Sequence, residues 1–109
     1  MKLNDQDLQY PTEVLEFIAG RIPREMTSVF AEIWNHRADG GITWTHLVSK
    51  IGDRYLVEKA LLLLETNGFV NVDPSPLDRR QKKYIPDEIR GKQLAVYLRN
   101  SKLNPNKEE

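Results

Sequence analysis

Two predicted helices joined by a glycine-containing turn constrain this 109-residue chain more than any other feature. Thr43 can cap a helix over residues 44–50, and Asp53 can cap a second helix over residues 53–67, because side-chain oxygens of Thr and Asp accept free amide protons at a helix start. Gly52 can turn the chain between the two helices. Such a short connection between two helices predicts a helix-turn-helix.

Two further helices are predicted before this pair. Thr12 can cap the first, over residues 12–22, and the second covers residues 24–37 before Asp39-Gly40-Gly41 ends it. In the first helix the following apolar residues recur at helical spacing: Val14, Phe17, Ile18 and Ile22, with Leu15 alongside. In the second helix the corresponding stripe is Met26, Val29, Phe30, Ile33 and Trp34. We interpret both stripes as core rather than as cofactor sites.

After Gly68 the pattern changes to two short strands, residues 69–72 and 82–85, with a loop between them. A last helix is predicted from Pro86 or Asp87 to about Asn100, with Leu94, Tyr97 and Leu98 on one face and Ile89 near its start. Three helices, a hairpin and a closing helix predict a winged helix-turn-helix. This is a mainly α fold with a small β-hairpin wing (α+β).

The predicted domain organisation has three parts. Residues 1–11 form a flexible N-terminal segment, residues 12–100 a single domain whose terminal helices dimerise, and residues 101–109 a frayed tail. Hydrophobic residues make up 39% and charged residues 29% of the chain, which is typical of a soluble globular domain.

The composition also excludes several classes of protein. The chain has no cysteine, which rules out disulfides, a cysteine nucleophile, a thiol redox sensor and a thiolate metal site. No apolar run approaches the length of about 18 residues that a membrane span needs. The first ten residues lack the apolar stretch of a secretory signal, so a cytoplasmic location is expected.

The charge is zero overall, with 16 Lys and Arg against 16 Asp and Glu, but it is unevenly distributed. Residues 1–40 carry four basic and seven acidic side chains, whereas residues 71–109 carry nine basic and six acidic ones. Four of the five residues from Arg79 to Lys83 are basic. A solvated face is one interpretation of such a run. The run also lies at the end of the predicted wing, so a second interpretation is that its basic side chains contact a bound molecule.

The stretch GFVNVDPSPLDRR, residues 68–80, resembles the wing signature of the MarR family of regulators, usually G-L-V-x-R-x-x-D-P-x-D-R-R. Upstream, the leucine-rich helix that ends at Gly68 is similar to the family's recognition helix, and downstream Gly91-Lys92-Gln93-Leu94 is similar to its L-T-x-x-G-R-x-L segment. The chain departs from the pattern at Val72, where the family has arginine. Its terminal helices are also short, so a small-molecule effector is doubtful.

This resemblance implies a homodimeric regulator of transcription that binds double-stranded DNA. Helix 53–67 would enter the major groove, and wing 73–83 would lie on the adjacent minor groove. The resemblance further implies that Asp78 pairs with a neighbouring arginine and stiffens the wing while the other arginine reaches DNA. The chemistry agrees, because a basic loop gains affinity by releasing counterions from phosphates.

The predicted DNA contacts come from three segments. Arg54 and Lys59 suit phosphate or guanine, and Tyr55 suits phosphate or a thymine methyl group. The preceding helix and the wing supply the remaining candidates: Thr43, Thr45, His46, Lys50, Arg79, Arg80, Lys82 and Lys83. Glu58 is unfavourable near phosphate unless it accepts from a cytosine or holds Arg54. We expect no catalytic residue, metal ligand or cofactor, because no such motif occurs.

Two questions remain open in the sequence. Residues Leu61–Leu64 point in four directions about a helix, so some leucine must be covered by another element of the chain or by a second copy. The alternative function is a winged-helix protein–protein interaction module in a transcription, replication or DNA-segregation assembly. Zero net charge and Glu58 favour this alternative, whereas the basic wing favours DNA.

Overall fold

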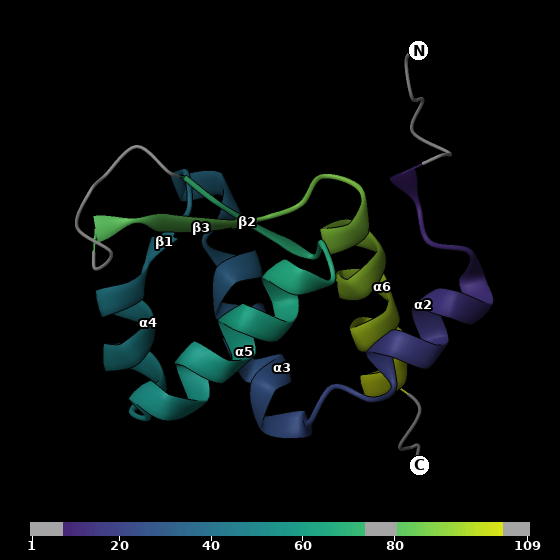
Figure 1. The fold of residues 1–109 in the computed structure, drawn as a ribbon, viewed down its shortest axis with the longest axis horizontal. Coiled ribbons are helices and arrows are strands. Elements are labelled where there is room, and N and C mark those ends of the chain that lie inside the picture. The colour runs from purple at the N-terminus through teal and green to yellow at the C-terminus, as the bar shows by residue number, and fades with distance from the viewer. Residues whose placement is uncertain (1–7, 74–80, 104–109) are drawn as a thin grey trace.

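The computed structural model describes residues 8–73 and 81–103 (Figure 1). Within these residues the fold is mainly helical, with five α-helices and a small three-stranded antiparallel sheet, which confirms the predicted α+β class. The helices are α2 (Thr12–Ala19), α3 (Arg24–Asn35), α4 (Trp44–Ile51), α5 (Arg54–Thr66) and α6 (Arg90–Leu103), with a 3₁₀ helix η1 (Arg37–Asp39). The strands are β1 (Ile42–Thr43), β2 (Val70–Val72) and β3 (Lys83–Pro86).

Strand β3 is the middle strand of the sheet, whose order is β1-β3-β2. Tyr84 of β3 lies opposite Ile42 of β1 and Val72 of β2, so the predicted hairpin pairs and β1 adds a third strand. Glycine is required just before β1, because Gly41 has a φ of 112° and an added Cβ would lie 3.0 Å from the Tyr84 carbonyl oxygen. The Gly40-Gly41 turn therefore brings β1 onto β3.

One continuous hydrophobic core joins the helices to the sheet. Helices α3 and α5 cross the middle of the molecule, with α4 at one end and α2 and α6 at the other (Figure 1). The largest fully buried side chains come from α3, α4, α5, α6 and the start of the hairpin: Phe30, Ile33, Leu47, Leu64, Phe69 and Leu94. The predicted inner residues of α5 are all buried: Val57, Ala60, Leu61 and Leu64. Their burial removes apolar surface from water and holds α5 against α3.

Only part of the predicted apolar stripe of the first helix is buried: Ile22, just after α2, is in the core and Ile18 is half-buried against it. Leu15 and Ala19 are buried, whereas Val14 is exposed and Phe17 is 60% exposed. Apolar residues lie on more than one side of this short helix, so helical spacing did not identify the inner side, and the small Ala19 permits close packing on α6. The predicted cap is also wrong, because Thr12 is the first helical residue and no side chain caps the helix.

Several predicted helix ends are displaced. Helix α2 ends at Ala19 rather than at residue 22, and α6 continues to Leu103, into the segment predicted as a frayed tail. Helix α3 ends at Asn35, and η1 follows it where the prediction continued the helix. Helix α6 begins at Arg90 rather than near Asp87, because a carboxylate oxygen of Asp87 accepts the backbone N–H groups of Ile89 at 3.1 Å and Arg90 at 3.0 Å. These bonds close a turn before the helix, so Asp87 acts as its cap.

The end of the predicted flexible N-terminal segment contacts the domain through Tyr10. Its hydroxyl donates to the Asn67 carbonyl at 2.7 Å, and its ring lies edge-on to Phe69 at 5.9 Å between centroids. The Gln93 side chain accepts the Tyr10 N–H at 3.0 Å and donates to its carbonyl at 2.9 Å. Tyr10 therefore ties the chain before α2 to the end of α5 and to α6.

Candidate nucleic-acid interface

The predicted caps of the α4–α5 unit are confirmed. The Thr43 hydroxyl accepts the N–H of His46 at 3.1 Å, and the Asp53 carboxylate accepts the N–H of Leu56 at 3.0 Å. Gly52, between the two helices, has a φ of 81°, a conformation that L side chains rarely adopt. Together these contacts fix where α5 starts and therefore which of its side chains face outward.

Three predicted contact residues of α5 lie on its outward side. Arg54, Tyr55 and Lys59 are all exposed, and the Tyr55 side chain is 68% exposed. Leu62, which we did not predict as a site residue, is also 69% exposed on this helix. It was recognisable in principle, because residues 55, 59 and 62 follow the i, i+4, i+7 spacing of one helix face. We call these four residues the α5 face.

The side chains of the α5 face make two interactions, one within the face and one with the neighbouring Glu58. The Lys59 ammonium lies 4.9 Å from the centroid of the Tyr55 ring, which is a cation–π distance. Arg54 Nε lies 3.6 Å from a Glu58 carboxylate oxygen. Of the two roles considered for Glu58 from the sequence, accepting from a cytosine or holding Arg54, the structure shows the contact with Arg54. An exposed pair of this kind is weak, so Arg54 can exchange Glu58 for another anion at low cost.

Trp44 extends the site beyond the residues predicted from sequence. Its ring centroid lies 5.8 Å from the Arg54 guanidinium carbon, which brings the start of α4 beside the start of α5. The sequence signal was an aromatic residue next to the cap of the first helix of the pair. Arg54 thus lies among an aromatic ring, a carboxylate and solvent.

The predicted contacts from α4 are arranged less uniformly. Thr45, His46 and Lys50 are exposed, whereas Thr43 is half-buried and uses its hydroxyl as the cap. The His46 ring packs edge-on against His36, with centroids 5.0 Å apart. His46 is therefore held in place by the end of α3 rather than being a freely moving surface side chain.

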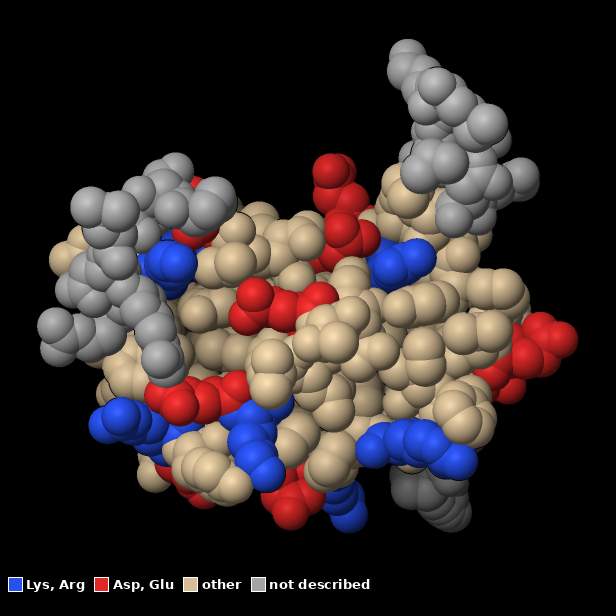
Figure 2. Space-filling view, viewed as in Figure 1, with Lys and Arg blue, Asp and Glu red and all other residues tan. Residues whose placement is uncertain are grey.

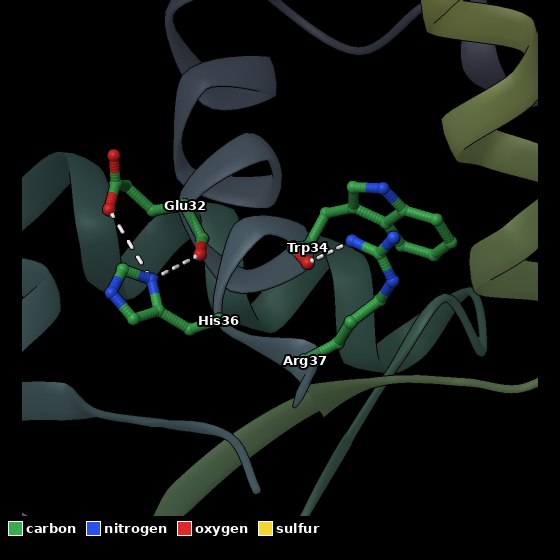
Figure 3. Close-up of polar contacts among 4 residues, drawn as sticks. All are labelled: Glu32, Trp34, His36 and Arg37. Carbon is green, nitrogen blue, oxygen red and sulfur yellow. Dashed lines mark hydrogen bonds and ion pairs between the residues drawn. The ribbon is translucent and has the colours of Figure 1, made fainter. Parts of the chain in front are cut away.

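The end of α3 supports this histidine contact (Figure 3). His36 Nδ1 lies 3.0 Å from the Glu32 carbonyl oxygen and 3.7 Å from the Glu32 carboxylate. Because a carbonyl oxygen can only accept a hydrogen bond, Nδ1 is the donor in the shorter contact. On the other side of the same turn, Arg37 donates to the Trp34 carbonyl at 2.7 Å and its guanidinium lies 4.1 Å from the Trp34 ring centroid. Both contacts fix side chains at the end of α3.

The basic residues of the hairpin divide into two groups. Lys83 is exposed on β3 and pairs in register with Thr43, so it lies beside the start of α4. Lys82 is half-buried, and its ammonium opposes the rise in the pKa of Glu65 that partial desolvation causes, so part of its charge is met within the chain. The predicted residues Asp78, Arg79 and Arg80 lie outside the described residues.

The surface around α4 and the first half of α5 is mixed in charge. Figure 2 shows Lys and Arg side chains interspersed with Asp and Glu there, while a broad area over the middle of α6 has few charges. Such a surface differs from a uniformly basic one, and Arg54 in it is paired with the Glu58 carboxylate. Local contacts of Arg54, Lys59 and Lys83 therefore matter more than a long-range positive field.

Within the described residues, no group of three or more His, Asp or Glu side chains is arranged to hold a metal ion. In the same part of the chain, no helix has both the length and the apolar character needed to cross a membrane. A comparison with known protein families, curated proteins and solved structures returns no match to this chain.

Proposed function

We propose that the chain is a winged helix-turn-helix regulator, similar to the MarR family, that binds double-stranded DNA as a homodimer. In this proposal α5 enters the major groove and the hairpin lies along the adjacent minor groove. The observation that carries it is the exposed Arg54, Tyr55 and Lys59 side chains on a helix whose start is fixed by Asp53 and Gly52.

The chemistry of the α5 face supports binding to a nucleic acid. Arginine and lysine pair with phosphate or with guanine, and Tyr55 can donate to phosphate or pack on a thymine methyl group. Lys83 and Thr43, adjacent on β3 and β1, extend the polar surface from α5 toward the hairpin. The element order, with a helix pair followed by a hairpin, agrees with the winged form.

A binding measurement with duplex DNA tests this proposal. Fluorescence anisotropy of a labelled duplex, titrated with the protein at low salt, should rise with a saturable transition that weakens as salt increases. Sites selected from a random duplex library should share a pseudo-palindromic sequence, with half-sites about 34 Å apart. Absence of binding to any duplex at low salt would remove the proposal.

The wing has its own test. The double substitution Arg79→Ala and Arg80→Ala removes two of the basic residues that the resemblance places at the minor groove, so duplex affinity should fall strongly while circular dichroism stays unchanged. Each lost phosphate contact should reduce the log–log salt slope by about 0.9. Unchanged affinity and slope would exclude a contact between these arginines and DNA.

One observation favours the alternative, a protein–protein interaction module. Leu62 is exposed on the same helix as Tyr55, and Glu58 lies between them with its carboxylate 3.6 Å from Arg54. An exposed aromatic ring, an arginine and an apolar side chain on one face suit a protein interface, because aromatic residues and arginine are enriched there. Replacing Leu62 with Ser should leave DNA affinity nearly unchanged in the DNA model and should abolish partner binding in the alternative.

A further inference from the structure

The two histidines of the chain lie side by side where the end of α3 meets the start of α4. The rings of His36 and His46 are 5.0 Å apart between centroids, and their planes are inclined at 68°. They stand ten positions apart in the sequence, so it is the fold that brings them together. His36 is half-buried and His46 is exposed, which leaves the pair accessible to a dissolved ion.

The spacing of the two rings matches that of imidazoles bound to one metal ion. A ring nitrogen binds Zn²⁺ at about 2.0–2.1 Å, so two imidazoles on one ion, at an angle of about 90–110°, have their centroids roughly 4.5–5.2 Å apart. The observed 5.0 Å lies within this range. Rings that pack without a metal have similar spacings, so the tautomer of His36 and the charge around it supply further evidence.

The hydrogen bond of His36 leaves its second nitrogen available as a ligand. Nδ1 donates to the Glu32 carbonyl oxygen at 3.0 Å, so Nε2 carries the lone pair in the neutral ring (Figure 3). A histidine that binds a metal through one nitrogen usually donates its other ring N–H to a carbonyl or a carboxylate, which fixes the ring orientation. His36 already has this arrangement.

The charge beside His36 favours an added cation. The Glu32 carboxylate lies 3.7 Å from His36 Nδ1, and within the described part of the chain its buried Oε1 has no hydrogen-bond partner. A buried oxygen without a partner costs free energy, and positive charge nearby offsets this cost. Arg37 does not supply that charge, because it donates to the Trp34 carbonyl on the other side of the turn (Figure 3).

We propose that His36 and His46 together bind one divalent transition-metal ion, such as Zn²⁺, through one ring nitrogen each. Imidazole suits Zn²⁺, Cu²⁺ and Ni²⁺, whereas Mg²⁺ and Ca²⁺ take oxygen ligands. Water completes the coordination, because no third His, Asp or Glu among the described residues forms a metal-binding group with the pair. The ion ties the end of α3 to the first turn of α4. The sequence did not predict this site, because a ten-residue separation matches no metal motif.

Calorimetric titration with Zn²⁺ tests the site, at a pH above the ordinary histidine pKa of about 6.5. The wild type should bind one Zn²⁺ per chain. His36→Ala and His46→Ala each remove one of the two ligands, so each should weaken binding about tenfold or more, at least the effect of losing an outer-shell partner. Because His46 is exposed, His46→Ala should keep the circular dichroism spectrum. Glu25→Gln, an exposed carboxylate at the start of α3, is the control and should keep the wild-type affinity.

Thermal melting gives a second readout. An ion that binds only the folded chain raises its melting temperature, so excess Zn²⁺ should stabilise the wild type and leave His46→Ala unchanged. No Zn²⁺ binding by the wild type, or wild-type affinity in either histidine variant, would overturn the proposed site. Neither result bears on DNA binding, which is measured without added metal.

Discussion

The two ends of the molecule present different kinds of surface. At the α4 and α5 end, the exposed side chains that define the α5 face are mostly polar or aromatic, with Arg54 and Lys59 as cations. At the α2 and α6 end, Phe17 and Val96 are exposed beside an aromatic groove. One core supports both ends, so the difference lies in the chemistry of each surface: cations beside aromatic rings at the first, and exposed apolar side chains beside an aromatic groove at the second.

Leu62 makes this contrast less sharp. It lies on α5 and is 69% exposed, so the polar end also has an apolar side chain. Leu61 and Leu64, its neighbours in the same helix, are buried. The four consecutive leucines therefore separate into core and surface positions, and the surface position is where the DNA and protein interpretations of α5 differ.

The largest expected effect is a loss of stability, and it distinguishes a core position of α5 from a surface position. Leu64→Ala removes a fully buried side chain and leaves a cavity, so the free energy of unfolding should fall by about 2–5 kcal/mol. Leu62→Ala, the same change on the exposed side of α5, should alter it by less than about 0.5 kcal/mol. Urea denaturation of both variants checks this, and equal losses would contradict the burial of α5 described above.

A smaller effect concerns Asp87, which connects β3 to α6. Burial tends to raise the pKa of Asp87, but hydrogen bonds from the Arg90 N–H, the Asn71 side chain and the Ile89 N–H, with the nearby Arg90 charge, lower it below its ordinary value. A lowered pKa in the folded state means that the carboxylate stabilises the fold above its ordinary pKa and that this contribution is lost as the pH falls through the folded value.

Asp87→Ala therefore should destabilise the protein at neutral pH by about 0.5–2 kcal/mol, the usual range for losing a helix cap. The difference from wild type should begin to shrink as the pH falls below the ordinary pKa of an aspartate and should be smallest below the lowered pKa that Asp87 has in the folded state. Chemical denaturation at a series of pH values measures both. A difference that stays constant down to pH 2 would show that the charge of Asp87 contributes nothing.

The smallest expected effect on stability tests how the two ends are joined. Tyr10→Phe removes the hydroxyl that donates to the Asn67 carbonyl at the end of α5 but keeps the ring against Phe69. The free energy of unfolding should fall by about 0.5–1.5 kcal/mol. Thermal melting with Tyr55→Phe as the matched control, an exposed tyrosine on α5, checks this value, and no difference between the two variants would exclude a stabilising role for Tyr10.

The α4–α5 unit was predictable because its local signals agree. Each of three positions holds a residue type that suits its backbone. As predicted, Thr43 and Asp53 cap the two helices and Gly52 forms the turn between them. In α2 the signals conflict, because Val14, Leu15 and Phe17 are all apolar and only packing against α6 selects Leu15. The anchoring of Tyr10 also needed tertiary information, since its partners Asn67 and Gln93 are far away in the chain.

The candidate site was predictable to a similar degree. The exposure of Arg54, Tyr55 and Lys59 followed from helical spacing and from the cap at Asp53. Helical spacing gives no information on contacts between elements, so it missed the proximity of Trp44 to Arg54. Partial charge compensation of Lys82 by Glu65 was missed for the same reason.

The salt dependence of duplex DNA binding tests the central claim, that the α5 face binds the phosphate backbone. Anisotropy titrations of wild type, Arg54→Gln, Lys59→Gln and Arg21→Gln give the slope of log affinity against log salt concentration. Loss of a phosphate contact should reduce the slope by about 0.9 for Arg54→Gln and Lys59→Gln, whereas Arg21→Gln, just after α2, should leave it unchanged. Slopes that match wild type in both α5 variants, or that fall equally in all three, would contradict the assignment of DNA binding to α5.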